Sequence, residues 1–477
     1  MDGYISYYKN ITDYHQSKLY EKELTTYNTF LYIIDTNTVY LENNHIDTTK
    51  IEDDQIFKNI LEKVSKYKLK KKKGGENAPI HNYDNEIFTK EMERLTKIIM
   101  ETISMTVYSM LKTGHLYFQN GNFNEGNIFF IPKDKRKMMT PQNSRCLINC
   151  DNRLKVLTRY IRDEYITPIF DANRVDTEIH QVKKCVIKYI VKKKTKLKLC
   201  FESIANIANI IHTTPYKYLL LDLTNAFNNV TYAFMYKILT EYLVVPEDIT
   251  ERENLSRGIV RLLSEMKYYC RQTKEYVKRN KGVPQGSSVS IDLFVLCMDY
   301  IVKHIIRELK NTLDLEYNTD YELVVYVDDI LILIKTNKFE QNITQIIDVF
   351  VNVFQEYHFQ LNGKKSKKSQ GLPNCEFDEV KPTDKYLGLY FETDVNKYLT
   401  IIEKEIRKRL GNNSKFHNMK IIDQNLKDNK FNVRQTMCIR GKLQYRMRPF
   451  AKNIEERNKL FHKLGYPNIA DTLFKIE

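Results

Sequence analysis

The sequence predicts a mixed α+β fold in which short buried strands alternate with longer helices. Short apolar runs lead directly into aspartates at 218–222 and 321–329, and apolar runs of this length are typical of buried strands. Longer amphipathic segments lie at 88–111 and 291–306, and their length favours helices. Since 42% of the 477 residues are hydrophobic, the chain can bury a sizeable core, as one multi-lobed unit or as about three small domains.

The N-terminal region is expected to be a small extension and linker covering 1–79. Residues 25–33 alternate like a strand, and residues 56–67 have the apolar periodicity of a helix. The lysines at 70–73 are followed by two glycines and a proline, which predicts a flexible linker. The same lysine run would equally suit a nuclear localisation signal or an arm that contacts nucleic acid.

The next segments are expected to form a hairpin and then helices. Residues 116–145 alternate like a β-hairpin, with Gly121 and Gly126 near the bend. Residues 151–210 have a helical and strongly basic pattern. From 216 onward the order is strand, two helices, two strands, a helix and a further strand.

The charge balance favours a polyanionic partner. The chain has 75 Lys and Arg against 60 Asp and Glu, a net charge of +15, and basic side chains bind phosphates with release of counterions. Excess lysine can also serve solubility alone. The N-terminus lacks the pattern of a signal peptide, and no apolar stretch is long enough to cross a membrane. We therefore expect an intracellular protein, nuclear or cytoplasmic, with no membrane contact.

The first candidate catalytic residue is Asp222, at the carboxyl end of the apolar run 218–221. Ligand sites gather at such strand ends in sheets with crossover helices. A single aspartate at this place is weak evidence, because aspartate often caps the helix that follows.

Two adjacent carboxylates form the second candidate. Asp328 and Asp329 lie between apolar segments, which predicts a β-hairpin with both carboxylates at its tip. Unpaired carboxylates beside one another are electrostatically costly, and a divalent cation between them would remove that cost. Mg²⁺ prefers such hard oxygen ligands. With Asp222, the pair could bridge two ions for phosphoryl transfer, whereas an Asp-Asp turn exposed to water is the alternative.

The third segment is Lys281-Gly-Val-Pro-Gln-Gly-Ser-Ser-Val-Ser290, which predicts a tight loop before a helix. Its small residues would let a nucleotide or a template base approach the backbone closely. The Gln285 amide can form hydrogen bonds with sugar or base edges. On its own, a turn of this kind indicates no function.

The three segments, in this order, resemble motifs A, B and C of reverse transcriptases. The matching patterns are Asp-x-x-x-Ala-Phe from Asp222, Gly-Val-Pro-Gln-Gly-Ser-x-x-Ser from Gly282 and Tyr-Val-Asp-Asp from Tyr326, spaced by 63 residues (222 to 285) and 43 residues (285 to 328). The resemblance implies an RNA-directed DNA polymerase that extends a primer 3′-hydroxyl with dNTPs. Its cofactors would be two Mg²⁺ ions, with Mn²⁺ as an alternative. Its partners would be an RNA template and a DNA primer or product duplex.

The resemblance also implies a right-hand polymerase. The fingers are expected at 80–215, and a palm of antiparallel sheet backed by helices at 216–395. A helical thumb is expected at 396–477, where the sequence is basic and helical in pattern and suits contact with duplex phosphates. About 80 residues follow the palm, which is too few for a thumb together with a ribonuclease H or endonuclease domain, so neither domain is expected.

The resemblance assigns roles to individual residues. The expected metal ligands are Asp222, Leu223, Asp328 and Asp329. The residues expected to contact the incoming nucleotide are Lys133, Lys135, Lys137, Phe227, Gln285 and Gly286. The residues expected near the primer and the template are Tyr326, Gln285, Leu387 and Gly388.

Two of the implied roles have an alternative. Phe227 lies where the family has a bulky gate that clashes with a ribose 2′-hydroxyl, but it could also be a core aromatic. Lys365 lies in a segment, 359–366, that resembles motif D. The resemblance implies that Lys365 protonates the leaving pyrophosphate, whereas a solvated lysine loop is the alternative.

The sequence departs from the family at three places in these motifs, and one of them is Ile291, which replaces the proline that usually follows the motif B serine. Met139 and Thr140 replace the arginine and proline that usually follow the fingers lysines. Lys137 or Arg145 would then contact the triphosphate instead. Asn228 stands where an aspartate is common after the gate residue, and it is not an expected metal ligand.

The subtype stays open between several alternatives. Residues 274–287 and 292–297 are similar to telomerase and to Penelope-like enzymes. The gap between motifs A and B leaves little room for the insertion typical of telomerase fingers, and the region before the fingers hairpin is short for a telomerase RNA-binding domain. The alternatives are a telomerase-like catalytic subunit that needs an RNA partner, an RNA-dependent RNA polymerase and a non-catalytic relic that binds nucleic acid. Phe227 argues against the second, and the intact carboxylates argue against the third.

Overall fold

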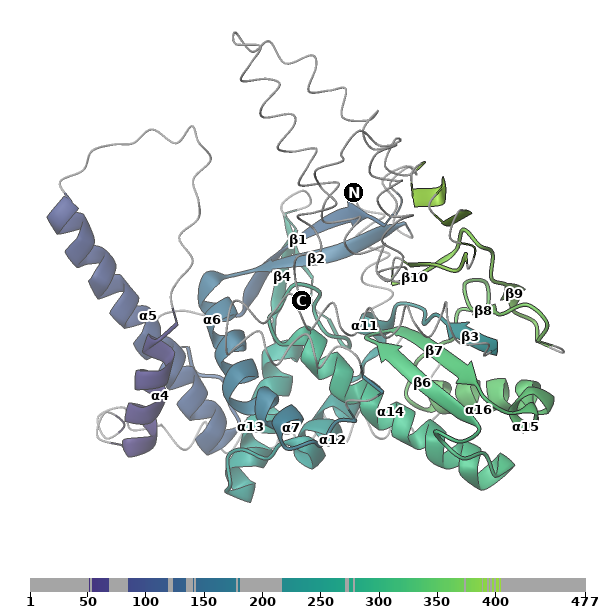
Figure 1. Cartoon of the computed structure of the whole chain (residues 1–477). Helices are drawn as coiled ribbons and strands as arrows, with labels where there is room; N and C mark the ends of the chain where they lie inside the picture. Colours follow the sequence, from purple (N-terminus) through teal and green to yellow (C-terminus); the bar gives the residue numbers. More distant parts are fainter. Residues whose placement is uncertain are drawn as a thin grey trace, which may run out of the picture.

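The computed structural model describes a defined part of the chain. The described residues are 51, 54–67, 85–118, 123–133, 140, 143–176, 179–180, 217–270, 274–277, 279–372, 375–387, 389–392, 394, 397–398, 400–402 and 404. Within them the fold is α+β, as predicted, with sheets of five, four and two strands and most of the helices on one side of them (Figure 1).

The five-stranded sheet has the order β6-β7-β3-β8-β9. β7 pairs antiparallel with both β6 and β3, and β3 pairs antiparallel with β8, whereas β8 and β9 run parallel. Leu221 lies opposite Ile330 and Tyr326 lies opposite Asp329. The carboxyl end of β3 and the β6–β7 turn therefore meet at the same end of the sheet. The strands are β3 (Lys217–Leu221), β6 (Tyr321–Tyr326), β7 (Asp329–Ile334), β8 (Lys367–Lys368) and β9 (Asp378–Glu379).

Both faces of this sheet are buried, because successive side chains of a strand point to opposite faces. Those that pack into the main core against the helices include Leu219, Leu221, Val325, Ile330 and Ile332. Those of the opposite face pack into a smaller cluster with the β10–β11 hairpin, and they are Val324, Leu331 and Leu333. The near-continuous apolar runs in the sequence follow from this burial on two sides.

Helices cover the core side of the sheet (Figure 1). α14 is buried nearly all round in its first half and packs against α12 and α16, as expected for a helix that is apolar on most sides. The helices of this region are α11 (Ala226–Asn229), α12 (Tyr232–Tyr242), α13 (Ile249–Ser264), α14 (Ser290–Leu313), α15 (Asn337–Gln341) and α16 (Ile343–Glu356). The predicted helix at 291–306 is confirmed, and it extends further at its C-terminal end.

The four-stranded sheet has the order β2-β1-β4-β5. It corrects the predicted position of the hairpin bend, because the bend lies between β1 and β2 and Gly126 lies inside β1. A Cβ atom at Gly126 would come within 2.4 Å of Ile148 Cγ2, so this glycine serves a close approach between strands. Gly121 lies outside the described residues. The strands are β1 (Glu125–Pro132), β2 (Ser144–Cys150), β4 (Lys267–Cys270) and β5 (Glu275–Val277).

Two of the predicted N-terminal helices are confirmed. α4 (Gln55–Ser65) begins at Asp54, whose side chain accepts a hydrogen bond from the Ile56 N–H, and it packs against α5 (Asn85–Thr113). Further helices follow β2, namely α6 (Asn152–Ile161), η1 (Arg162–Ile166) and α7 (Thr167–Asp171). The predicted strand at 25–33, the lysine linker, most of the basic helical region and most of the predicted thumb lie outside the described residues. In the part of the chain described here, none of the helices combines the length and the apolar character that crossing a bilayer requires.

A short hairpin, β10 (Lys385–Tyr386) and β11 (Leu389–Tyr390), closes the second face of the five-stranded sheet. The buried Tyr386 hydroxyl donates to the carbonyl oxygens of Val324 at 3.3 Å and Asp329 at 3.4 Å. The β10–β11 hairpin is therefore attached directly to the β6–β7 hairpin.

This attachment gives a first prediction. Tyr386→Phe keeps the ring but removes the hydroxyl that bridges the two hairpins, so the free energy of unfolding should fall by about 1 kcal/mol. Thermal or chemical denaturation measures the change. Tyr276→Phe is the matched control, because Tyr276 is 56% exposed on β5 and its variant should be as stable as the parent. Equal stability of all three proteins would contradict the prediction.

Candidate active site

Asp222 is held by backbone contacts directly after β3. Its N–H donates to Ser366 Oγ at 3.2 Å, and its carbonyl oxygen accepts from the Asn362 N–H at 2.8 Å. The next residue, Leu223, forms an antiparallel bridge with Leu361. Because Ser366 is fully buried, the segment 361–366 holds the Asp222 backbone in place and thereby limits the positions that its carboxylate can occupy.

The adjacent carboxylate pair lies at the β6–β7 turn, as predicted. Asp328 is in the turn, and Asp329 is the first residue of β7. Val327 in the same turn has φ +60°, a left-handed conformation that is unusual for a β-branched residue. Such strain costs roughly 1–3 kcal/mol and persists where surrounding structure enforces it, often at functional sites. Here the strand pairing on both sides of β7 enforces the turn.

Burial and mutual repulsion make the charged forms of these carboxylates unfavourable. Burial raises the pKa of Asp328 above its ordinary value, and the nearby charge of Asp222 adds to this effect. Burial, followed by the charges of Asp328 and Asp222, raises the pKa of Asp329 to about 6. Three acidic groups on two strands therefore repel one another in a partly desolvated site.

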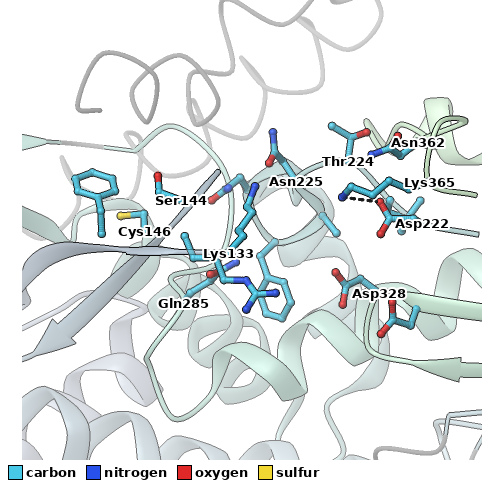
Figure 2. Close-up of a pocket in the computed structure, with 17 residues that line it drawn as sticks. Lys133, Ser144, Cys146, Asp222, Thr224, Asn225, Gln285, Asp328, Asn362 and Lys365 are labelled. Atoms are coloured by element: carbon cyan, nitrogen blue, oxygen red, sulfur yellow. Dashed lines mark hydrogen bonds and ion pairs between the residues drawn. The ribbon is translucent and has the colours of Figure 1, made fainter. Parts of the chain in front are cut away.

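Basic side chains lie close to these carboxylates. Lys365 Nζ contacts Asp222 Oδ2 at 3.2 Å, although the Lys365 side chain is 64% exposed (Figure 2). Burial lowers the pKa of Lys133, and the charges of Lys365 and Arg145 lower it further. These mutually repelling cations would be stabilised by a polyanionic ligand.

A cavity of about 430 Å³ lies between the two larger sheets and contains these groups. In Figure 2, Lys133 and Gln285 lie across the cavity from Asp222 and Asn362. The sequence-predicted residues that line the cavity are Lys133, Arg145, Asp222, Leu223, Phe227, Gln285, Asp328, Asp329 and Lys365. The structure thus brings together residues that are up to 232 positions apart in the chain (133 to 365).

Several predicted residues lie elsewhere. Tyr326 ends β6 and is 36% exposed, and Gly286 is exposed next to the cavity residue Gln285. Leu387 lies in the turn between β10 and β11, with φ +48°. Lys135, Lys137 and Gly388 lie outside the described residues.

The sequence analysis missed several polar residues on the cavity wall. They are Ser144, Thr224, Asn225, Asn228 and Asn362. Asn225 has φ +49°, and asparagine tolerates this conformation better than most residues. An asparagine directly before the Ala-Phe of the first motif could therefore have been recognised as a turn residue close to Asp222. Asn362 gives no such signal, because its backbone contact with Asp222 spans 140 residues of chain (222 to 362).

Phe227 has features of both roles that the sequence left open, a gate against the ribose 2′-hydroxyl and a core aromatic. Its ring stacks on Phe294 with centroids 4.4 Å apart and an interplanar angle of 10°, which is a core contact. The same residue lines the cavity. Its backbone is also fixed, because the Val283 N–H donates to the Phe227 carbonyl oxygen at 2.8 Å.

The Pro-Gln-Gly loop packs directly against β2. The Ile148 N–H donates to the Gln285 carbonyl oxygen at 2.9 Å. Gly286 has φ +128°, and a Cβ atom there would come within 2.3 Å of the Ile148 carbonyl oxygen. A glycine is therefore required at position 286 for the loop to approach the strand, and the loop fixes the width of the cavity at this point.

The donor set fits a hard divalent cation. Carboxylate oxygens are the ligands that Mg²⁺ and Mn²⁺ prefer, and the raised pKa values of Asp328 and Asp329 indicate negative charge that lacks compensation. In the arrangement described, no three acidic, histidine or cysteine side chains of the described residues converge on one ion. Instead, the Lys365 ammonium contacts Asp222, so binding of metal would require these side chains to rearrange.

Comparison with known sequences identifies one family. The sequence model of the family described as "Reverse transcriptase (RNA-dependent DNA polymerase)" matches residues 131–391, which is more than half of the chain. A search of curated proteins gave no match.

Two solved structures illustrate more distant similarity. Apo telomerase from Candida tropicalis, truncated from its C-terminal domain, is 15% identical, with a TM-score of 0.35, over 62% of this chain and 59% of that chain. Telomerase from Candida albicans in complex with a TWJ fragment of telomeric RNA is 12% identical, with a TM-score of 0.37, over 72% of this chain and 58% of that chain. The chain thus covers less than two thirds of either structure.

The electrostatics of the site give a second prediction. Asp329→Asn removes one of the repelling charges, so it should raise the free energy of unfolding by about 1–2 kcal/mol at pH 7.5 in a chelating buffer. The gain should vanish with falling pH. An aspartate with a folded pKa near 6 and an unfolded pKa near 3.9 destabilises the fold fully above about pH 6, progressively less down to about pH 4, and not below.

Thermal denaturation between pH 4 and pH 8 measures this effect. Asp378→Asn is the control, since Asp378 is exposed on β9 and its variant should melt with the parent at every pH. A destabilised Asp329→Asn protein at pH 7.5 would contradict the charge repulsion described here.

Proposed function

Because the chain belongs to the reverse transcriptase (RNA-dependent DNA polymerase) family, we propose that it copies an RNA template by extending a primer 3′-hydroxyl with dNTPs. The observation that carries the proposal is the meeting of Asp222, Asp328 and Asp329 on one cavity with basic side chains close by. Such a site can bind a triphosphate and neutralise the charge that develops during phosphoryl transfer.

A right-hand layout fits the described elements. We assign the fingers to 80–215, the palm to 216–395 and the thumb to 396–477, after an N-terminal extension and linker at 1–79. The five-stranded sheet and its helices would be the palm. β4 and β5 fall within the palm range, but β4 pairs with β1 and β5 pairs with β4, so the fingers sheet would contain strands from two separate segments.

The acidic residues would hold the metal ions. Asp222, Asp328, Asp329 and the Leu223 carbonyl would bind two Mg²⁺ ions, or Mn²⁺ ions, which supply charge neutralisation for the attacking 3′-oxygen and for the leaving pyrophosphate. Lys133 faces the same cavity and would bind the triphosphate oxygens. Lys365 would leave Asp222 to protonate the pyrophosphate. Lys135 and Lys137 would add triphosphate contacts from the fingers.

The cavity wall would select the sugar. The Phe227 ring is held by stacking on Phe294 and lines the cavity beside the Asp222 segment. A ribose 2′-hydroxyl would meet this ring, whereas a deoxyribose would not. The stacked partner limits how far the ring can retreat, so dNTPs would be favoured over rNTPs.

The remaining residues would contact template and primer. Gln285 and Gly286 would lie beside the templating base, where the backbone is accessible at a glycine. Tyr326 would lie beside the primer terminus, because it pairs with Asp329 at the catalytic turn. Leu387 and Gly388 would support the primer end from the hairpin that Tyr386 attaches to β6 and β7.

Primer extension on poly(rA)/oligo(dT) with Mg²⁺, using dTTP and UTP in parallel, tests this function. We expect extension with dTTP and a loss of at least about 1000-fold in Asp328→Ala/Asp329→Ala, as expected when the groups that stabilise the transition state are removed. Extension with UTP alone would instead indicate an RNA polymerase. Tight binding without extension would favour a non-catalytic protein, unless addition of a dedicated RNA subunit restores activity, as a telomerase-like enzyme would require.

The gate gives a separate prediction. Phe227→Ala removes the ring that would clash with the 2′-hydroxyl, so the ratio of kcat/KM for dTTP over UTP should fall by about 10- to 100-fold. Steady-state kinetics on the same template measures the ratio. Phe234→Ala, which removes a buried ring of α12 that does not line the cavity, should lower stability but leave the ratio unchanged. An unchanged ratio in Phe227→Ala would remove the gate role.

A further inference from the structure

Arg279 is a buried charged side chain beside the cavity. It is 2% exposed, and its Nη2 donates to Asn228 Oδ1 at 2.9 Å. Its Nε donates to the Lys281 carbonyl oxygen at 3.2 Å, and its guanidinium lies 5.8 Å from the ring centroid of Tyr268. Burial of a guanidinium is costly unless its donors are satisfied. The side chain is therefore held in one position by its partners.

Arg279 fits at this place because its neighbour is a glycine. Gly282 has φ +90°, and a Cβ atom there would come within 2.2 Å of Arg279 Nη2 and within 2.8 Å of Asn228 Cα. The guanidinium, the glycine backbone and the Asn228 backbone are thus in direct contact. No larger residue can occupy position 282 without displacing the guanidinium or Asn228.

The residue that Arg279 contacts is next to Phe227 on a very short helix. α11 (Ala226–Asn229) is one turn long, and a helix of this length is not stable by itself. It is held to the loop at 279–283, where the Val283 N–H donates to the Phe227 carbonyl oxygen and the Gly282 N–H donates to the Val230 carbonyl oxygen. Two side-chain hydrogen bonds add to this attachment, one from Arg279 to Asn228 and one from Lys281 Nζ to Asn229 Oδ1 at 3.5 Å.

We propose that Arg279 is a positioning residue for sugar discrimination, which it supports by holding Asn228 and thereby the Phe227 ring. The inference rests on the proposed polymerase function. Arg279 does not line the cavity, so its effect would be indirect. Without it, α11 could shift along the cavity wall, and small displacements of a positioned group have large effects on catalysis. A ring that can move away from the sugar excludes a 2′-hydroxyl less strictly.

Two substitutions separate this role from general stability. Arg279→Met keeps the length of the stem but removes both hydrogen bonds, and Asn228→Leu removes the acceptor on α11. Each should lower the kcat/KM ratio of dTTP over UTP by about 10-fold. The double variant should have about the same ratio of dTTP over UTP as the single variant with the lower ratio, because both changes break the same contact. Asn228→Asp retains an acceptor oxygen and should keep more of the ratio than Asn228→Leu.

Arg261→Met is the matched control. Arg261 is also a buried arginine, 4% exposed on α13, and neither it nor its partner His115 lines the cavity. Its loss should lower the melting temperature without changing the ratio of dTTP over UTP. If Arg279→Met fails to fold, Arg279→Lys replaces it, since a single ammonium keeps the charge but cannot reproduce the two-point contact of the guanidinium.

The outcomes are distinct. A lower ratio in the Arg279 and Asn228 variants, with an unchanged ratio in Arg261→Met, would support the inference. An equal loss of kcat/KM for both nucleotides in a folded Arg279 variant would overturn it and leave Arg279 a purely structural residue. If the parent protein extends the primer with neither nucleotide, the proposed polymerase function itself fails, and the positioning role fails with it.

Discussion

The site depends on the meeting of three carboxylates that repel one another. Asp222 directly follows one strand, and Asp328 and Asp329 lie on the neighbouring hairpin. Their partial burial raises the pKa values of Asp328 and Asp329, which means that the fold places negative charge where it is unfavourable. Structural carboxylates are normally paired or solvated, so an arrangement of this kind favours a role in binding cations and phosphates.

The surrounding fold has the properties needed to hold this charge. β7 pairs on both sides, and this pairing enforces the left-handed conformation of Val327. The segment that contains Asn362 and Ser366 fixes the backbone of Asp222, and the Tyr386 hydroxyl ties a further hairpin to the strands. The rigid sheet therefore determines the separation of the carboxylates, whereas the flexible Lys365 side chain is free to change partners.

Local patterns were sufficient to predict the strands, the hairpin and about half of the residues that line the cavity. Apolar runs and turn residues act over a few positions, and they correctly located β3, β6, β7 and α14. Gly126 was misread as part of a bend because a glycine that permits close strand packing has the same local appearance. Asn362 and Arg279 act through contacts that span 140 and 51 residues, and a single sequence carries no local signal for such contacts.

The central claim is that the three carboxylates form a site for divalent cations, and Mg²⁺ binding tests it most directly. The melting temperature of the parent protein and of Asp328→Asn/Asp329→Asn would be measured in a chelating buffer and then across a Mg²⁺ titration. We expect saturating Mg²⁺ to stabilise the parent by about 2–3 kcal/mol at 100 times the dissociation constant, and the variant hardly at all. Equal stabilisation of the two proteins, or none in either, would contradict the account.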